Sequence, residues 1–185
     1  LSKDEIESAL KFHLGVTQVI WLDQGVVIDK TDGHADNLAR FVGPGRVVMT
    51  WIEDHLDPKY EICQDAYLRL SKAHDAKGRP LEVIKIIQPS PLFLTDEEAA
   101  GINVVDGTAQ RLPGLRLAAS YVDFYFCNGA MIVPALDPAQ DDKAARTFKK
   151  LCPNHDIIMV PAREILLGGG NIHCITQQQP KGQFG

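Results

Sequence analysis

The stretch Gly43-Pro44-Gly45-Arg46-Val-Val-Met-Thr-Trp-Ile52 places an apolar run directly after a turn of glycine and proline. An apolar, β-branched run with such boundaries predicts a buried strand. Leu38–Val42 predicts a strand on the other side of the turn, and Leu81–Ile87 a further strand. Between them, Asp57-Pro58 begins a predicted helix with one apolar face, formed by Cys63, Ala66, Tyr67, Leu70 and Ala73. The order strand, strand, helix, strand indicates an α/β (α+β) fold.

The same order recurs along the chain. Leu115–Cys127 and Ala130–Val133 predict a hairpin turning at Asn128-Gly129, before a helix from Asp137-Pro138 and a strand at Asp156–Val160. Nearer the start, we expect a helix at Ser2–Leu14 that opens with a capping box and ends at Gly15, followed by a buried strand at Val16–Leu22. Repetition at a long period suggests stacked modules with a shared core, although the pattern alone leaves a plain α+β domain open. The segments that start at His34, Tyr121 and Asn171 occupy equivalent places in this repetition.

Bulk composition narrows the class of protein. The 185 residues are 45% hydrophobic and 23% charged, with a net charge of −5 and no basic stripe, so we expect no nucleic-acid partner. No apolar run approaches the roughly 18 residues of a membrane span, and the first residues lack the apolar core of a signal peptide. We therefore expect no membrane partner. Four sparse cysteines favour a reduced setting, so we expect a cytoplasmic protein. Because residue 1 is Leu, we also expect a fragment of something longer.

The first candidate for chemistry is Thr31-Asp32-Gly33-His34-Ala35-Asp36-Asn37. Residues two apart on a strand face the same side, so His34 and Asp36 could project together. A histidine beside a carboxylate can shuttle protons near neutral pH. The alternative is a surface turn rich in aspartate and glycine.

The second candidate is Gly168-Gly169-Gly170-Asn171-Ile172-His173-Cys174. Consecutive glycines usually mark close backbone approach or unusual dihedral angles. A cysteine after such a turn could meet backbone N–H dipoles, which lower a thiol pKa and favour a thiolate nucleophile. The alternative is a buried structural cysteine, the interpretation we prefer for the other three, Cys63, Cys127 and Cys152. A metal site is not expected, because the spacing of Cys152, His155, His173 and Cys174 is unlike that of zinc ligands.

Taken together, the segments Asp32–Phe41 and Gly168–Pro180 closely resemble the signatures of the agmatine deiminases, and the resemblance runs along nearly all 185 residues. One position departs from the family pattern: Asp123 stands where the family usually has Asn, which we expect to affect only a local hydrogen bond.

The resemblance implies a fold, the pentein propeller of five ββαβ modules around a pseudo-fivefold axis. About two and a half modules would be present here, with residues 1–185 forming one domain that is the C-terminal portion of the catalytic domain. The N-terminal half, with further substrate-binding carboxylates, would be absent. A propeller cut open in this way would expose apolar module faces, and such an edge should associate with another copy or with the missing half, so we expect a homo-oligomer.

The implied reaction is the hydrolysis of agmatine to N-carbamoylputrescine and ammonia, with no cofactor and no metal. Cys174 would be the nucleophile, His34 the proton carrier and Asp36 the carboxylate that binds the guanidinium, while Gly168, Gly169 and Gly170 would let the backbone approach the substrate. Several alternatives stay open. They are a deiminase of arginine or peptidylarginine, with the long irregular stretch at residues 88–113 helping to set the substrate, and an inactive fragment. A papain-like enzyme is disfavoured because His34 precedes Cys174.

Overall fold

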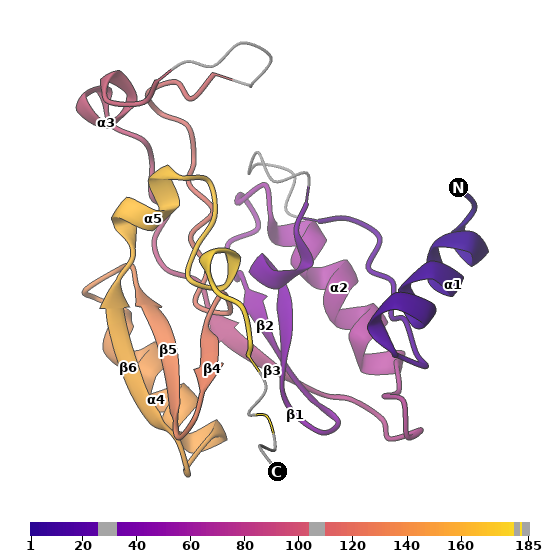
Figure 1. The fold of residues 1–185 in the computed structure, drawn as a ribbon. Helices are drawn as coiled ribbons and strands as arrows, with labels where there is room; N and C mark the ends of the chain where they lie inside the picture. Colours follow the sequence, from indigo (N-terminus) through magenta and orange to yellow (C-terminus); the bar gives the residue numbers. More distant parts are fainter. Residues whose placement is uncertain (26–32, 104–109, 180–181, 183–185) are drawn as a thin grey trace.

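Two three-stranded sheets lie side by side in the computed structural model, which describes residues 1–25, 33–103, 110–179 and 182 (Figure 1). The first sheet has the order β1-β2-β3 and the second the order β4-β5-β6. Each sheet takes its three strands from one continuous part of the chain. The chain is therefore an α/β protein made of repeated units.

The first unit runs from β1 (Ala39–Gly43) through β2 (Arg46–Trp51) and α2 (Tyr60–Lys72) to β3 (Glu82–Ile87). β1 pairs antiparallel with β2 through a turn in which Gly45 has a φ of 70°. β3 pairs parallel with β2, with Arg46 opposite Glu82. A parallel neighbour needs a crossover, which α2 supplies. The predicted order of strand, strand, helix and strand is confirmed.

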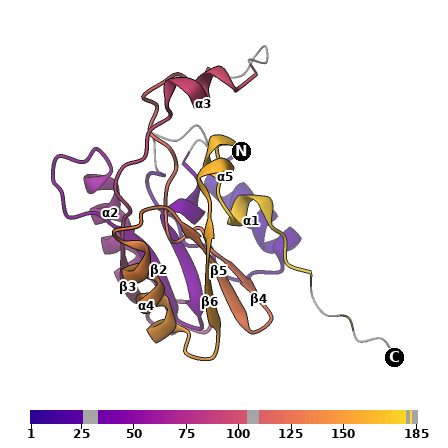
Figure 2. The ribbon, with the colours of Figure 1, turned by 90° about the vertical axis from the view of Figure 1, so that its left-hand side faces the viewer.

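The second unit repeats this topology with β4 (Tyr125–Cys127), β5 (Ala130–Ala135), α4 (Asp141–Leu151) and β6 (Asp156–Pro161). β4 and β5 form the predicted hairpin around Asn128-Gly129, and β6 pairs parallel with β5. Figure 2 shows α4 lying against the strands of this unit. The recurrence predicted from the sequence is thus a repeated ββαβ module, as the resemblance led us to expect.

Two clusters of buried side chains form the core, and they correspond only partly to the two modules. The smaller packs α2 onto the first sheet and buries the expected helix face through Cys63, Ala66 and Leu70. The larger surrounds Phe148 of α4 and also takes in two residues of the first sheet, Val48 and Ile86. The modules therefore share a core, as the repetition predicted.

The N-terminal segment departs from the prediction. α1 (Lys3–Leu14) forms with the capping box between Ser2 and Glu5, and Gly15 ends it with a φ of 65°. None of its residues is buried. The strand predicted at residues 16–22 is absent, because no described segment offers these residues a backbone ladder. The Trp21 indole instead donates to Glu7 of α1 at 2.7 Å.

A second departure precedes β4. The strand expected from Leu115 forms only at Tyr125–Cys127, whereas Leu117–Phe124 is irregular and buried throughout. The apolar run here reflects burial on all sides rather than a strand ladder. The Ser120 hydroxyl accepts from the backbone N–H of Val122 at 3.2 Å, which stabilises a turn. This turn carries Asp123 toward the site described below.

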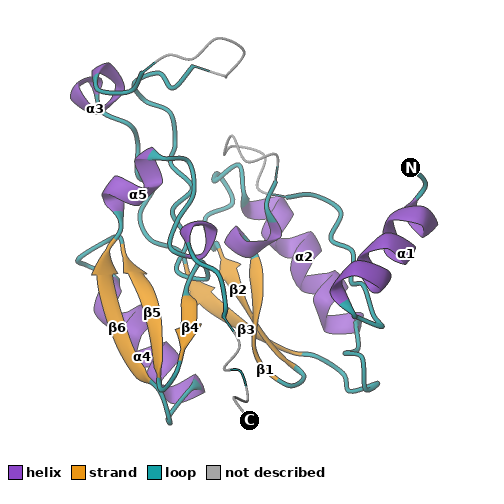
Figure 3. Cartoon of the chain, in the orientation of Figure 1, coloured by secondary structure: helices purple, strands orange, loops and turns teal. Residues whose placement is uncertain are grey.

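The described part of the long stretch at residues 88–113 is irregular except for α3 (Asp96–Ala100), and the last short elements that the structure describes are α5 (Arg163–Leu167) and η2 (His173–Ile175) (Figure 3). The Arg163 guanidinium donates to both oxygens of Glu98, at 2.6 and 2.9 Å, and so ties α3 to α5. Residues 104–109 of this stretch lie outside the described residues. None of the described helices has the length and apolar character needed to cross a membrane.

Candidate active site

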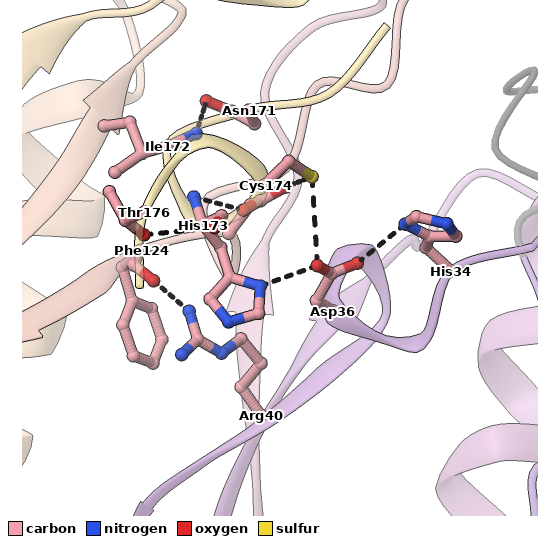
Figure 4. A network of polar contacts seen from close by, with 10 residues as sticks. His34, Asp36, Arg40, Phe124, Asn171, Ile172, His173, Cys174 and Thr176 are labelled. Atoms are coloured by element: carbon pink, nitrogen blue, oxygen red, sulfur yellow. Dashed lines mark hydrogen bonds and ion pairs between the residues drawn. The ribbon is translucent and has the colours of Figure 1, made fainter. Parts of the chain in front are cut away.

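Three turns meet at one point, one from the start of each module and one after α5 (Figure 4). The first is η1 (Ala35–Asn37) with His34 before it, the second is the turn at Ser120–Asp123, and the third is η2. A buried hydroxyl joins the first two, because Thr50 of β2 donates to the Asn37 carbonyl and lies 2.9 Å from the Ser120 hydroxyl. The equivalent segments found in the sequence therefore converge in space.

Cys174 lies at the centre of this convergence, and its side chain is exposed. Its Sγ lies 3.9 Å from Asp36 Oδ2 and 3.9 Å from Asp123 Oδ2. Side-chain donor atoms of His34, Asp36 and Cys174 all lie within 4.8 Å of one another. The structure thus brings the three residues singled out in the sequence together, although residues 26–32, which include the start of the first motif, lie outside the described part.

The glycine turn before Cys174 fits closely against its neighbours. Gly169 has a φ of 94°, a conformation that glycine adopts without steric cost. A Cβ on Gly170 would lie 2.7 Å from Cys174 Cβ and 3.0 Å from its Sγ. Arg111 donates to the Gly168 carbonyl at 2.7 Å and also to that of Leu167. The glycines are needed because the cysteine and the Arg111 side chain pack directly onto the backbone.

Asp36 lies between two histidines. Its Oδ2 lies 2.7 Å from His173 Nδ1, and its Oδ1 lies 3.7 Å from His34 Nδ1. The His34 side chain is 53% exposed, whereas that of Asp36 is 17% exposed. His34 is therefore free to meet a ligand from solvent, and Asp36 is held in place by His173. Sequence reasoning considered His173 only for a metal site, although its position beside Cys174 was a usable signal.

Known proteins are similar in sequence to nearly all of this chain. A family model described as Porphyromonas-type peptidyl-arginine deiminase matches residues 1–180. The agmatine deiminase of Pseudomonas fluorescens is 49% identical over 183 residues, which are 99% of this chain and 50% of that protein. The agmatine deiminase of Medicago truncatula is 52% identical, over 97% of this chain and 49% of that protein.

The chain belongs to the Porphyromonas-type peptidyl-arginine deiminase family.

A solved structure supports the membership. The agmatine deiminase of Enterococcus faecalis superposes with a TM-score of 0.92 at 41% identity, over 98% of this chain and 49% of that one. The two ββαβ modules are thus modules of the pentein propeller. The chain spans about half the length of the relatives that it matches.

Among the ionisable groups of the candidate site, Asp123 is the most buried, with 0% of its surface exposed. Its Oδ1 accepts from the His173 backbone N–H at 2.8 Å. Burial, reinforced by the nearby Asp36, raises the pKa of Asp123 to about 7, against the opposing influence of the His173 N–H and Arg40. The sequence led us to expect only a local hydrogen bond here. The structure adds a direct contact with the candidate nucleophile.

The Cys174 thiol differs from the expectation of a lowered pKa. Although Cys174 is exposed as a residue, partial burial of its sulfur raises the pKa of the thiol, and the charges of Asp123 and Asp36 add to that effect, while a hydrogen bond from the backbone at Asn171 opposes it. Two carboxylates near the sulfur disfavour a second negative charge. Without a cation, the site therefore holds Cys174 as a thiol.

The other cysteines lie away from this convergence. Cys63 and Cys152 are buried, and burial raises the pKa of the Cys63 thiol to about 11. Both fit the structural role predicted for them. Cys127 is exposed, contrary to its expected burial, because it ends the short strand β4 at the hairpin turn.

Arg40 supplies a positive charge beside the two carboxylates, although the sequence interpretation gave it no role. Its guanidinium lies 4.4 Å from the centre of the Phe124 ring and donates to the Phe124 carbonyl. Burial lowers its pKa, while Asp123 and Asp36 oppose that effect. Because the Arg40 side chain contacts Phe124, it stabilises the turn that carries Asp123. The positive charge of Arg40 also stabilises the negative charge of the Asp123 carboxylate.

The donor atoms could also attract a metal ion, since the sets His34, Asp36, Cys174 and Asp36, Asp123, His173 each lie within 4.8 Å. Each set has one imidazole with one thiol at most, which is unlike the cysteine and histidine sets of structural zinc sites. We assign no metal to the site. Its concentration of negative oxygen beside an exposed sulfur suits an organic cation equally well.

Proposed function

We propose that the protein to which this chain belongs is an agmatine deiminase, which hydrolyses agmatine to N-carbamoylputrescine and ammonia. The observation that carries the proposal is the position of the exposed Cys174 sulfur between two carboxylates, with His34 in reach. The agmatine deiminase relatives at about 50% identity supply the choice of substrate. The proposal covers the whole protein, because the chain spans half of those relatives.

Substrate binding would begin with charge. A guanidinium is a planar cation whose N–H groups pair with carboxylates in two parallel hydrogen bonds. Asp36, fixed by His173, is placed to hold that plane next to the sulfur. Holding the central carbon near the nucleophile supplies much of the rate enhancement that orientation can give. The backbone at Gly168, Gly169 and Gly170 would line the approach, since Cys174 packs directly against Gly170.

The chemistry would proceed through a covalent intermediate. Cys174 thiolate attacks the guanidinium carbon, and the new C–S bond forms as a C–N π bond opens. His34 gives a proton to the departing nitrogen, so ammonia leaves and an S-alkylthiouronium remains on Cys174. His34 then takes a proton from water, which attacks the same carbon. The C–S bond breaks, and N-carbamoylputrescine and the free cysteine are released. No cofactor takes part in these steps.

We also propose that residues 1–185 are one domain forming the C-terminal portion of a pentein catalytic domain. The remaining modules would supply further carboxylates to the same site, and a homo-oligomer in the cytoplasm is the expected state. The 185 residues alone would then deiminate agmatine poorly, because a single binding carboxylate leaves a guanidinium free to tilt. Residues 88–113 lie between β3 and β4, where they could help to set the substrate.

A second candidate function is deimination of arginine or peptidylarginine. The description of the matching family favours it, since that description names peptidyl-arginine. The two functions differ in the group that the site must accept beyond the guanidinium. Agmatine has only an amine there, whereas arginine adds a carboxylate and peptidylarginine a backbone.

The test is ammonia release by the intact protein from agmatine, arginine and a blocked arginine amide, with Cys174→Ser as the inactive control. We expect kcat/KM for agmatine to exceed the values for arginine and the arginine amide by at least about a hundredfold. An active site built for one substrate strongly rejects analogues that leave its polar groups unpaired. Preference for either arginine compound would transfer the function to the second candidate. Equal agmatine turnover by the 185-residue chain and the intact protein would overturn the fragment proposal.

A further inference from the structure

Asp123 contacts the Cys174 sulfur from the protein interior, while Cys174 as a residue is exposed. The carboxyl group is 0% exposed, and its Oδ2 lies 3.9 Å from Sγ, within hydrogen-bonding reach of a thiol. Its other oxygen accepts the His173 backbone N–H, which fixes the carboxyl plane. A substrate that arrives from solvent therefore meets the sulfur first, with Asp123 behind it.

Charged and titratable groups surround Asp123 on every element packed against it. Asp36 approaches from η1, Arg40 from β1, and His173 and Cys174 from η2. Arg40 is the guanidinium among these described groups, and its side chain also contacts Phe124. A carboxylate in this position lacks water and adds to the negative charge of Asp36, so it has a strong tendency to take up a proton. The pKa of Asp123, raised to about 7, agrees with that tendency.

We propose that Asp123 is a further catalytic residue, the base that receives the proton of the Cys174 thiol when a cationic guanidinium binds. The S–H bond breaks and an O–H bond forms at Oδ2, so the pair has one negative charge before and after the transfer. No proton is exchanged with solvent. The inference rests on the proposed function, because a cation must bind at the exposed side of the sulfur.

The direction of transfer follows from where the charge is better stabilised. Before binding, the negative charge is on a carboxylate without solvent, and the sulfur is a thiol. A guanidinium in front of the sulfur attracts negative charge to the atom that it touches. Moving the proton from Sγ to Oδ2 places the charge beside the cation and relieves the desolvation of Asp123.

The transfer also separates the thiol proton from the proton that His34 donates. A histidine that accepted the thiol proton could pass the same proton to the departing nitrogen, so one group could serve both steps. Here Asp123 Oδ2 lies 3.9 Å from Sγ, whereas the His34 side chain is 53% exposed and its Nδ1 lies 3.7 Å from Asp36. With Asp123 as the acceptor of the thiol proton, the two proton tasks belong to two groups.

The test is the pH profile of alkylation of Cys174 by iodoacetamide in the intact protein, read on the Cys174 peptide by mass spectrometry. A shared proton gives the wild-type protein two rises, one near pH 7 and one above pH 9, with a plateau between them. Asp123→Asn cannot hold the proton and should show a single rise. His34→Gln and His173→Gln should keep both rises, and Asp36→Asn should move the lower one to lower pH.

Two results would overturn the proposal: a lower rise that persists in Asp123→Asn, or one that disappears in a histidine variant. A purely structural role for Asp123 would scale the rates without changing the number of rises. If Asp123→Asn fails to fold, ¹³C NMR of the aspartate carboxyls in the wild-type protein should show one that titrates near pH 7 and moves in Cys174→Ser. The absence of such a carboxyl also contradicts the proposal.

The same proteins separate this inference from the proposed function. Agmatine turnover is measured on the wild-type protein beside the alkylation profile. Lack of turnover with two rises would reject the deiminase function and keep the thiol–carboxyl proton pair. Turnover with a single wild-type rise would keep the function and reject Asp123 as the proton acceptor.

Discussion

Each of the two modules begins with a turn that places a carboxylate beside the Cys174 sulfur. The two carboxylates lie in different environments. Asp36, from the first turn, and Asp123, from the second, each have Oδ2 at 3.9 Å from Cys174 Sγ. Asp36 lies between two histidines, with His34 exposed to solvent. Asp123 is fully buried, and its oxygen accepts a backbone N–H. The repeated backbone places the carboxylates, and the surroundings give them different chemistry.

The comparison teaches that a repeat can build an asymmetric site. Both modules have the same order of strands and helix, and both turns end where an antiparallel strand pair begins. Only the first turn has a histidine two residues before its aspartate. We therefore propose cation binding for the first turn and proton storage for the second.

The largest expected effect comes from the third turn, on which both carboxylates converge. Cys174→Ser in the intact protein should lower kcat for agmatine by at least about 10⁴-fold, because a serine hydroxyl is a far weaker nucleophile than a thiolate. Ammonia release measures it. Cys127→Ser is the matched control, since Cys127 is also exposed but lies at the β4–β5 hairpin. A large loss in the control with the fold intact would contradict the assignment of the nucleophile.

Exchanging each carboxylate for its amide tests the asymmetry itself. Asp36→Asn should lower kcat/KM by roughly 10³-fold, since it removes the charge that binds the cation. Asp123→Asn should cost less, about 10- to 100-fold at pH 7, because solvent can also accept the thiol proton. Steady-state kinetics of the two variants decide the order. Equal losses of kcat/KM in the two variants would mean that Asp36 and Asp123 have the same role.

The cores of the two modules should also respond unequally. Phe148→Ala in α4 should lower the free energy of unfolding by about 3–5 kcal/mol, and Leu70→Ala in α2 by about 2–4 kcal/mol. Phe148 belongs to the larger cluster, which also includes Val48 and Ile86 of the first sheet. Urea denaturation of both variants provides the comparison. A larger loss from Leu70→Ala would show that the shared core is not centred on the second module.

The smallest effect concerns pH and stability. The pKa of Asp123 in the folded protein, about 7, exceeds its ordinary value of 3.8. Protonated Asp123 therefore favours the folded state fully below about pH 4, and that contribution falls as pH rises through 7. Asp123→Asn should lack this fall and be more stable than wild type at pH 8, by about 1–4 kcal/mol. Urea denaturation at pH 5 and pH 8 measures it, and a difference that shrinks at pH 8 would contradict the account.

Much of the fold could be predicted because local patterns specify it. The glycine-containing turns at Gly45 and Gly129 take the left-handed conformations that hairpins favour, and the apolar face of α2 recurs at helical spacing. The segment at residues 16–22 could not be predicted, because a strand needs a backbone partner that a local pattern does not reveal. Leu117–Phe124 was mistaken for a strand since burial on all sides produces the same apolar run.

The candidate site also has features that the sequence could predict and features that it could not. The proximity of His34, Asp36 and Cys174 could be predicted because each lies in a motif of unusual residues. The environment of Asp123 could not be predicted, since its pKa depends on Asp36, Arg40 and His173 from distant parts of the chain. The pKa of Cys174 was misjudged for the same reason. Its neighbouring carboxylates come from residues 36 and 123, which no local spacing connects to it.

The central claim is that the three turns form one site at which Cys174 attacks a guanidinium carbon. Rapid acid quenching of the intact protein with agmatine, followed by peptide mass spectrometry, tests it most directly. The account predicts a transient adduct on the Cys174 peptide, with the mass of agmatine less ammonia, that is absent in Cys174→Ser. Agmatine turnover without that adduct on Cys174 at any quench time, or with an adduct on Cys127 instead, would contradict the claim.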